Sequence, residues 1–532
     1  MKGVTSQKNK NYDRTSSPHG SGEIDWVITL LPLSITGGIA ALLLTFPQQS
    51  MHAIDVLWNI FVNKLGFFYI LLGFGVVCTA FYLAFSKYGG IRLGTLDKPR
   101  YGNFAWGSMI FTSTMAADIL YWSLIEWGYY YTASPLGLTN LTTAEKQDWA
   151  SAYPFFHWGI TPWSFHIVCA VAFGYMLHVR RRKKQKLSEA CRPLFAGKID
   201  GVFGTVIDVF SVVGMLAGIA TTFSLATPLL SLAISAVSGI PESRALTLTI
   251  LCIIAGVYTS AVLLGIKGIA HLAKISVVCF LSLVLFVFLL APKLYIIETS
   301  VTGLGKMLHH FIALSTWMDP LRVSGENGTG FPQQWTIFYW AYWIAWFVAT
   351  PFFIGTISEG RTIRNTVLGG LLCGIAGTYC SFTVLGNYGL YLETHGVVPA
   401  AEQLQSGVAP AAVILGILET LPFAKIVLVL LIVTMIAFYA STFDAITMVM
   451  SSYSQRQLRG GEPKKGLRVF WSVVFILLPA ALILTGSNLS QLQSLSIIAA
   501  FPLGVIMILI IVSFFKDAQN GKEFEKDRVR RR

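Results

Sequence analysis

The chain has 532 residues, of which 54% are hydrophobic and only 12% charged, and its mean hydropathy is +0.63. A soluble domain carries roughly twice that share of charged residues, so the composition excludes an ordinary soluble protein and indicates a polytopic membrane protein. The net charge of +13 does not indicate nucleic-acid binding, because the basic residues stand in short blocks between apolar runs, as in cytoplasmic loops.

The polar N-terminal segment precedes a series of apolar runs. Residues 1–24 contain no cleavable signal peptide, and we expect them to be disordered. A membrane-spanning helix needs about 20 apolar residues. The sequence predicts twelve spans, at roughly 25–46, 66–86, 103–131, 149–178, 200–239, 246–266, 273–292, 332–357, 365–392, 421–452, 467–486 and 491–515. We interpret 295–316 and 408–420 as interfacial helices, because ionisable residues interrupt them.

The distribution of basic residues predicts the orientation of the chain. An even number of spans places both termini on one side, and 32 of the 39 Lys and Arg residues fall on that side. The positive-inside rule then predicts that both termini are cytoplasmic. The block 180–184 serves as a topology anchor or contacts anionic lipid. The seven cysteines have no metal-ligand or disulfide spacing and are expected to be packing residues.

Ionisable and hydroxyl side chains within the spans are the informative residues, since each is costly there. The third span carries Asp118 after a run of small and hydroxyl residues, and Glu126 follows it. The tenth span carries Ser441 and Thr442. The sequence contains no phosphate loop, metal-ligand cluster or nucleophile motif. It therefore favours a carrier or channel over an enzyme.

The fourth and eighth spans carry unusual aromatic patterns. In the fourth, Trp158 and Trp163 flank Gly159 and Pro162, which allow a local break in the helix. In the eighth, eight of the thirteen residues in 335–347 are aromatic, and none is charged. Two interpretations of this stretch stay open. It is an interfacial aromatic helix, or it supplies the walls of a cation cage, because Trp and Tyr ring faces attract quaternary ammonium groups.

Three motifs together resemble those of the betaine/choline/carnitine transporter family, and the resemblance extends over nearly the whole chain. They are His157-Trp158-Gly159 with Pro162-Trp163; Phe331-Pro332 and Trp335-Thr336 leading into Phe338-Tyr339-Trp340-Ala341-Tyr342-Trp343; and Ile357-Ser358-Glu359-Gly360-Arg361-Thr362-Ile363-Arg364. The resemblance implies an all-α membrane protein of twelve transmembrane helices. Ten of these helices form two inverted five-helix repeats, as in sodium-coupled amino-acid transporters, and two extra helices precede them. The family is generally trimeric.

The resemblance also implies a substrate site. Family members enclose a trimethylammonium group with aromatic residues, and the matching positions here are Trp158, Trp163 and Trp343. Tyr129 matches a tyrosine that carnitine-type members use. Trp346 matches a tryptophan on the cytoplasmic side of the pathway.

The chain departs from the family pattern in three places. His166 stands where a tyrosine is common, and it either fills space or hydrogen-bonds the substrate. Tyr342 replaces the first of two adjacent tryptophans. The glycine-rich segment of sodium-coupled members is here Thr114-Met115-Ala116-Ala117-Asp118, with Asp in the last position, as in proton-coupled choline members.

Three roles are open for Asp118. It is a structural carboxylate bonded to hydroxyls, a coupling group that loads and releases a proton, or a counter-charge for a cationic substrate such as choline. Ser441 and Thr442 match a sodium-binding pair in sodium-coupled members, with Met115 nearby, but helix packing explains these hydroxyls about equally well. Exchangers that need no ion carry an arginine where this chain has Ser276, although Lys274 stands two residues before it.

We therefore expect a secondary transporter for quaternary ammonium compounds of choline, betaine or carnitine type in the cytoplasmic membrane, driven by H⁺ or Na⁺. The alternative is ion-independent exchange, such as carnitine/γ-butyrobetaine antiport. We expect a small quaternary ammonium substrate, membrane lipids and two further copies of the chain as partners, and no cofactor. The expected regions are a cytoplasmic N-terminus (1–24), two peripheral helices (25–100), a first repeat (101–294), an external helix and loop (295–330), a second repeat (331–516) and a basic cytoplasmic tail (517–532).

Overall fold

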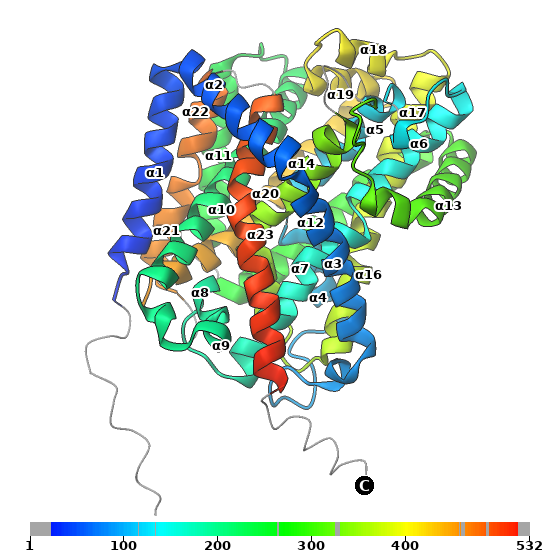
Figure 1. Cartoon of the computed structure of the whole chain (residues 1–532). Coiled ribbons are helices and arrows are strands. Elements are labelled where there is room, and N and C mark those ends of the chain that lie inside the picture. Colours follow the sequence, from blue (N-terminus) through cyan, green and yellow to red (C-terminus); the bar gives the residue numbers. More distant parts are fainter. Residues whose placement is uncertain are drawn as a thin grey trace, which may run out of the picture.

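A computed structural model describes residues 23–519, except 115, 134, 263–264, 325–329, 457, 459–462 and 486–488. Within these residues the protein is helical throughout (Figure 1), and its only β-type pairings are two isolated bridges, Ile24 with Gln455 and Arg92 with Thr362. The structure thus agrees with the predicted all-α membrane fold.

The helices that lie in the predicted spans form the body of the molecule. They are α1 (Trp26–Thr45), α3 (Gly66–Phe85), α4 (Asn103–Thr112), α5 (Ala116–Tyr131), α6 (Thr143–His157), α7 (Ile160–Gly174), α10 (Val202–Ser238), α11 (Arg244–Val262), α12 (Gly265–Leu290), α14 (Ile337–Trp346), α15 (Thr350–Ile357), α16 (Ile363–Ser381), α20 (Ala424–Tyr453), α21 (Lys465–Val474), α22 (Leu477–Thr485) and α23 (Leu489–Gln519).

The remaining helices and the π-helical turns connect these helices or continue them. The helices are α2 (Pro47–Trp58), α8 (Leu187–Ala190), α9 (Arg192–Phe195), α13 (Lys293–Thr316), α17 (Asn387–Thr394), α18 (Ala400–Gln405) and α19 (Pro410–Glu419), and the π-helical turns are η1 (Asn59–Lys64), η4 (Tyr175–Val179), η6 (Pro332–Thr336) and η7 (Phe382–Gly386). Short 3₁₀ turns are η2 (Lys87–Gly90), η3 (Pro135–Gly137) and η5 (Ala196–Asp200). The two segments predicted to be interfacial are helices α13 and α19, and neither is long and apolar enough to count as a span.

In the described part of the chain, nine helices are long and apolar enough to cross a membrane, and eleven spans result if each of two bent pairs counts as one. Helix α11 lies in the remaining predicted span, 246–266, and is apolar, but the part of it whose side chains are described, Arg244–Ser260, is shorter than the length limit. The count of exactly twelve spans therefore stays a prediction.

Two spans are broken in their middle. Helices α4 and α5 meet at an angle of 65°, and α14 and α15 meet at 53°. Pro351 lies in the first turn of α15 and lacks the N–H that a continuous helix would need. Before it, the chain tightens, since the backbone N–H of Phe347 bonds the carbonyl of Ile344. The sequence predicted neither of these breaks in this chain.

The fourth span is also interrupted, as its Gly and Pro predicted. Helix α6 ends at His157 and α7 begins at Ile160. Gly159 in the turn allows a close approach, because a side chain there would overlap the carbonyl oxygen of Phe155 and the hydroxyl of Tyr379. The break brings Trp158 and Trp163 to the same part of the interior.

The two ends of the described chain lie at one end of the bundle, the lower end in Figure 1. Helices α5, α6, α17, α18 and α19 reach the opposite end, which we call the distal end. This arrangement fits an even number of crossings. The red helix α23 crosses the front of the bundle and packs against α10 and α14.

Candidate functional site

Three fully buried tryptophans from different segments meet in the interior, and we call them the tryptophan cluster. Trp158 ends α6, Trp163 lies in the first turn of α7, and Trp343 lies on α14. The ring centre of Trp343 is 5.5 Å from that of Trp158 and 5.3 Å from that of Trp163, with the ring planes inclined at 67° and 64°. The structure thus brings together the three residues predicted to enclose a cation.

Neighbouring groups hold each member of this cluster in place. The indole N–H of Trp158 donates to Glu126 Oε2 at 2.6 Å, and the hydroxyl of Thr378 donates to the carbonyl oxygen of Trp158 at 2.9 Å. The indole of Trp163 lies directly against Gly374 of α16, where any side chain would overlap the ring. These contacts leave the rings little freedom to rotate.

His166 supports Trp343. Its Nε2 hydrogen-bonds the carbonyl oxygen of Trp343 at 3.0 Å, and its ring centre lies 5.1 Å from that of Trp343. Its Nδ1 is buried and has no hydrogen-bond partner within the described residues. Because Nε2 donates to a carbonyl oxygen, Nδ1 of the neutral imidazole is left as an acceptor for a hydroxyl group of a substrate.

Several buried donors around the cluster are unsatisfied. The indole N–H groups of Trp163, Trp343 and Trp346 are buried and have no acceptor within the described part of the chain. Unpaired buried polar groups are rare in folded proteins, and each calls for a water or a ligand. Their grouping along α7 and α14 indicates a place where a substrate with oxygen atoms can be held.

Asp118 lies beside this region on α5 and is fully buried. Its Oδ2 accepts hydrogen bonds from Thr222 Oγ1 of α10 and from the hydroxyl of Tyr342 on α14, each at 2.7 Å. Its Oδ1 has no partner, and none of the ion pairs within the described residues involves it. An intramembrane carboxylate without a cation is costly, so a proton or a cationic ligand is needed to balance it.

Sequence analysis singled out Tyr342 as a departure from the family pattern, and the structure makes it a hydrogen-bond donor to Asp118. Thr222 was missed. The adjacent hydroxyls of Thr221 and Thr222 inside an apolar run are the only signal that could have drawn attention to it.

The predicted ion-binding hydroxyls lie at the break between α4 and α5. Thr442 Oγ1 is 2.8 Å from the carbonyl oxygen of Thr112 and 2.9 Å from that of Thr114. Ser441 Oγ bonds the carbonyl of Phe438 at 3.1 Å and lies 3.3 Å from Ser276 Oγ of α12. Met115 lies outside the described residues. The arrangement gathers hydroxyl and carbonyl oxygens, the ligand type that a hard cation prefers.

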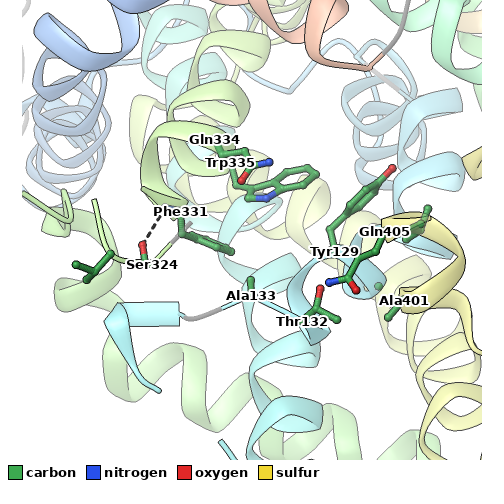
Figure 2. A pocket seen from close by; sticks show the side chains of 12 residues that line it. Tyr129, Thr132, Ala133, Ser324, Phe331, Gln334, Trp335, Ala401 and Gln405 are labelled. Carbon is green, nitrogen blue, oxygen red and sulfur yellow. Dashed lines mark hydrogen bonds between the residues drawn. The ribbon is translucent and has the colours of Figure 1, made fainter. Parts of the chain in front are cut away.

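Tyr129 lies apart from the tryptophan cluster, near the distal end. It lines a cavity of about 570 Å³, which we call the distal pocket, and its ring centre is 4.8 Å from that of Trp335. Figure 2 shows the two rings next to each other, with Gln405 and Thr132 close to Tyr129 and with Phe331 and Ser324 beyond Trp335. Among the described residues that line the pocket, none has a charged side chain.

Aromatic rings fill the space between the distal pocket and the cluster. Trp335 stacks on Tyr339 with 6.4 Å between ring centres, and Tyr339 lies 5.6 Å from Trp158. All these rings except Tyr129 are buried. In this conformation Tyr129 and the cluster are therefore separated by Trp335 and Tyr339, and Tyr129 would join the cage only after these rings move.

Trp346 lies beyond the cluster, just before the break between α14 and α15. It is fully buried, packs against Gly218 of α10, and has its ring centre 6.4 Å from that of Phe443. Because it lies on the other side of Trp343 from Trp335, the order along η6 and α14 is Trp335 nearest the distal pocket, then Trp343, then Trp346.

Comparison with known proteins finds one matching family model, described as the betaine/carnitine/choline family of transporters, over residues 27–523. The chain is 31% identical to the osmo-independent choline transporter BetT1 of Acinetobacter baylyi, covering 91% of each protein. It is 29% identical to a carnitine transporter of Acinetobacter baumannii, covering 83% of this chain and 79% of that protein. It is 28% identical to an ectoine/hydroxyectoine transporter of Virgibacillus pantothenticus, covering 91% and 95%.

Proposed function

The chain belongs to the betaine/carnitine/choline family of transporters, and on that premise we propose that it imports small quaternary ammonium compounds by ion-coupled secondary transport. The protein is a multi-pass membrane transporter and not an enzyme. The trimethylammonium group of the substrate binds among Trp158, Trp163 and Trp343.

The observation that carries the proposal is the convergence of these three indoles. The ring centre of Trp343 lies 5.3 Å from that of Trp163 and 5.5 Å from that of Trp158. The ring planes in both pairs are steeply inclined, so the rings present faces as well as edges to one another. A quaternary ammonium cation interacts favourably with such faces, and the interaction strengthens where water is excluded. The unsatisfied N–H groups of Trp163 and Trp343 would meet the oxygen atoms of the same ligand.

Asp118 favours a substrate with a net positive charge. Betaine and carnitine carry their own carboxylate, whereas choline does not, and a buried anion beside Tyr342 complements the charge of choline. The same carboxylate offers a place to carry a proton. We therefore propose choline-type substrates and coupling to H⁺, with Asp118 in both roles.

Exchange without a coupling ion is supported less well. Ser276, at the position where exchangers carry arginine, bonds the carbonyl of Ala437 and lies against Ser441. Lys274 is exposed and belongs to a different face of α12. No basic side chain thus takes the place of a cation beside Ser441 among the described residues.

The proposal extends to location and assembly. The chain acts in the cytoplasmic membrane with both termini in the cytoplasm, which follows from the distribution of its basic residues. We propose that it works as a homotrimer, as family resemblance implies.

The test is uptake of labelled choline into proteoliposomes, with pH and Na⁺ gradients varied separately and with betaine, carnitine and ectoine as competitors. We expect saturable choline uptake that an inward proton gradient stimulates and that Na⁺ leaves unchanged. Counterflow that persists without any ion gradient and is unaffected by imposing one would instead identify exchange. Absence of competition by every quaternary ammonium compound would refute the substrate class.

A further inference from the structure

A second buried carboxylate touches the tryptophan cluster. Glu126 lies on α5 and is fully buried, and its Oε2 accepts the indole N–H of Trp158 at 2.6 Å. Its Oε1 accepts the hydroxyl of Tyr130 at 2.8 Å. No lysine or arginine pairs with it within the described residues, and its nearest basic group is His157, 3.5 Å away.

Glu126 is the end of a chain of hydrogen bonds that joins three segments of the site. The Tyr130 hydroxyl also contacts His157 Nδ1 at 2.8 Å, and His157 Nε2 contacts Thr336 Oγ1 at 3.1 Å. With the Nδ1 tautomer of His157, each group donates to the next from Thr336 to Glu126, and the carboxylate receives two donors without giving any. This arrangement suits the ionised carboxylate and links α5, α6 and η6.

A neutral glutamine would satisfy the same partners once the chain of hydrogen bonds through Tyr130, His157 and Thr336 reverses its direction. A glutamine oxygen accepts an indole N–H as a glutamate oxygen does, so packing alone gives no reason to bury a charge there. The charge has an electrical consequence for Trp158. An anionic acceptor attracts the N–H proton and shifts electron density of the indole onto its ring. The attraction of a cation to an aromatic face is electrostatic, so it grows with that electron density.

We propose that the ionised carboxylate of Glu126 is a positioning and specificity-determining group that acts through Trp158 and increases the preference of the site for cations over neutral molecules of the same shape. The inference rests on the proposed function, in which Trp158 is one wall of the cation site. It assigns different tasks to the two intramembrane carboxylates. Asp118 balances the substrate charge and carries the proton, whereas Glu126 raises the electron density of the cage wall.

The experiment compares choline with 3,3-dimethyl-1-butanol, its neutral isostere, in binding to purified wild type and Glu126→Gln. Glutamine keeps the volume and an oxygen acceptor for Trp158. We expect choline affinity to fall about tenfold, which is about 1.4 kcal/mol, while the affinity of the neutral isostere stays the same. A merely structural role would weaken both ligands by the same factor, and an unchanged choline affinity would overturn the proposal as well.

Three further variants keep the outcomes separate. In a Trp158→Phe background no N–H reaches Glu126, so adding Glu126→Gln should not weaken choline further, and a second full loss would overturn the proposal. Glu126→Asp draws the carboxylate back and should give an intermediate, choline-selective loss even if Glu126→Gln does not fold. Trp163→Ala tests the proposed function alone, because Trp163 does not contact Glu126. Full choline affinity in Trp163→Ala would refute the cage, whereas loss there with an unaffected Glu126→Gln would refute only the role of Glu126.

Discussion

Thr442 of α20 places its hydroxyl 2.9 Å from the carbonyl oxygen of Thr114, although 328 positions separate the two residues in the chain. The same hydroxyl is 2.8 Å from the carbonyl of Thr112, whose oxygen is free because α4 ends there. Thr350 of α15 bonds the next carbonyl, that of Ser113, at 2.9 Å. The break in the third span is therefore fixed by hydroxyls from two other helices rather than by glycines.

We expect Thr442→Val to destabilise the protein without altering any dependence on sodium. The substitution leaves the carbonyls of Thr112 and Thr114 without their donor, which costs about 1–3 kcal/mol. Thermal unfolding of the purified variant should show a lower midpoint than that of the wild type. Choline uptake by the wild type should be the same with Na⁺ as with K⁺ outside, and the same should hold for the variant. If Na⁺ stimulates wild-type uptake and Thr442→Val removes the stimulation, the oxygens form a sodium site and proton coupling is wrong.

Asp118→Asn should separate choline from betaine. Asparagine keeps an oxygen for the hydroxyls of Thr222 and Tyr342 but removes the charge. Loss of one partner of a buried charge pair costs about 2–5 kcal/mol, so choline affinity should fall at least thirtyfold, whereas zwitterionic betaine should lose little. Stimulation of uptake by an inward proton gradient should also disappear.

Asp118→Gly serves as the second variant, since it removes both the charge and the hydrogen-bond acceptor. Competition and uptake assays at several external pH values measure both effects. Unchanged pH dependence together with an unchanged choline/betaine ratio in both variants would show that Asp118 is only structural.

Trp343→Ala should weaken substrate binding in addition to destabilising the fold, since the indole is fully buried. It removes the indole that contacts both Trp158 and Trp163, and a desolvated cation–π contact is worth about 2 kcal/mol. Trp471→Ala is the matched control, because Trp471 is equally buried on α21 but bonds Ser454 away from the cluster. Choline binding to purified protein should fall about thirtyfold only in the first variant. Equal affinities in the two variants would place the substrate elsewhere.

The sequence predicted best what depends on local pattern. The break at Gly159 and the spans themselves could be predicted because glycine, proline and apolar runs act within one segment. The resemblance to the transporter family predicted that Trp158, Trp163 and Trp343 lie together, which composition and spacing could not show. Pro351 was a visible signal for the break between α14 and α15, and the prediction of a span at 332–357 made no use of it.

The sequence could not predict which side chains on different helices contact each other. The bond between Glu126 and Trp158 joins residues 32 positions apart and depends on how α5 and α6 pack. Thr222 reaches Asp118 from a helix 104 positions away. The position of Tyr129 depends on the conformation of the whole site, since Trp335 and Tyr339 separate it from the cluster here. Such contacts are set by tertiary packing, which one sequence does not encode in any local pattern.

Gly374→Ala should impair the site through Trp163. The added methyl group would overlap the indole, so either the ring or α16 must shift, and overpacking of this kind costs about 1–3 kcal/mol. Gly256→Ala on α11 is the control, because nothing lies within 4 Å of a methyl group there. Choline competition should show a raised inhibition constant only for Gly374→Ala. Equal constants would mean that the position of Trp163 does not matter for binding.

A buried ion pair between Arg468 of α21 and Asp444 of α20 should control stability rather than transport. The exposed fractions of the two side chains are 3% and 0%. Arg468→Met leaves the carboxylate of Asp444 buried without its partner, which typically costs about 3–5 kcal/mol. The double variant Arg468→Met/Asp444→Leu removes both charges and should recover most of that loss.

For comparison, the pair of Arg456 with Glu23 is 62% and 51% exposed, so Arg456→Met should cost less than about 1 kcal/mol. Thermal unfolding of the purified variants measures all three, and uptake normalised to folded protein should be the same in the double variant as in wild type. If the double variant is stable but does not transport, Asp444 takes part in coupling and its role is not only structural.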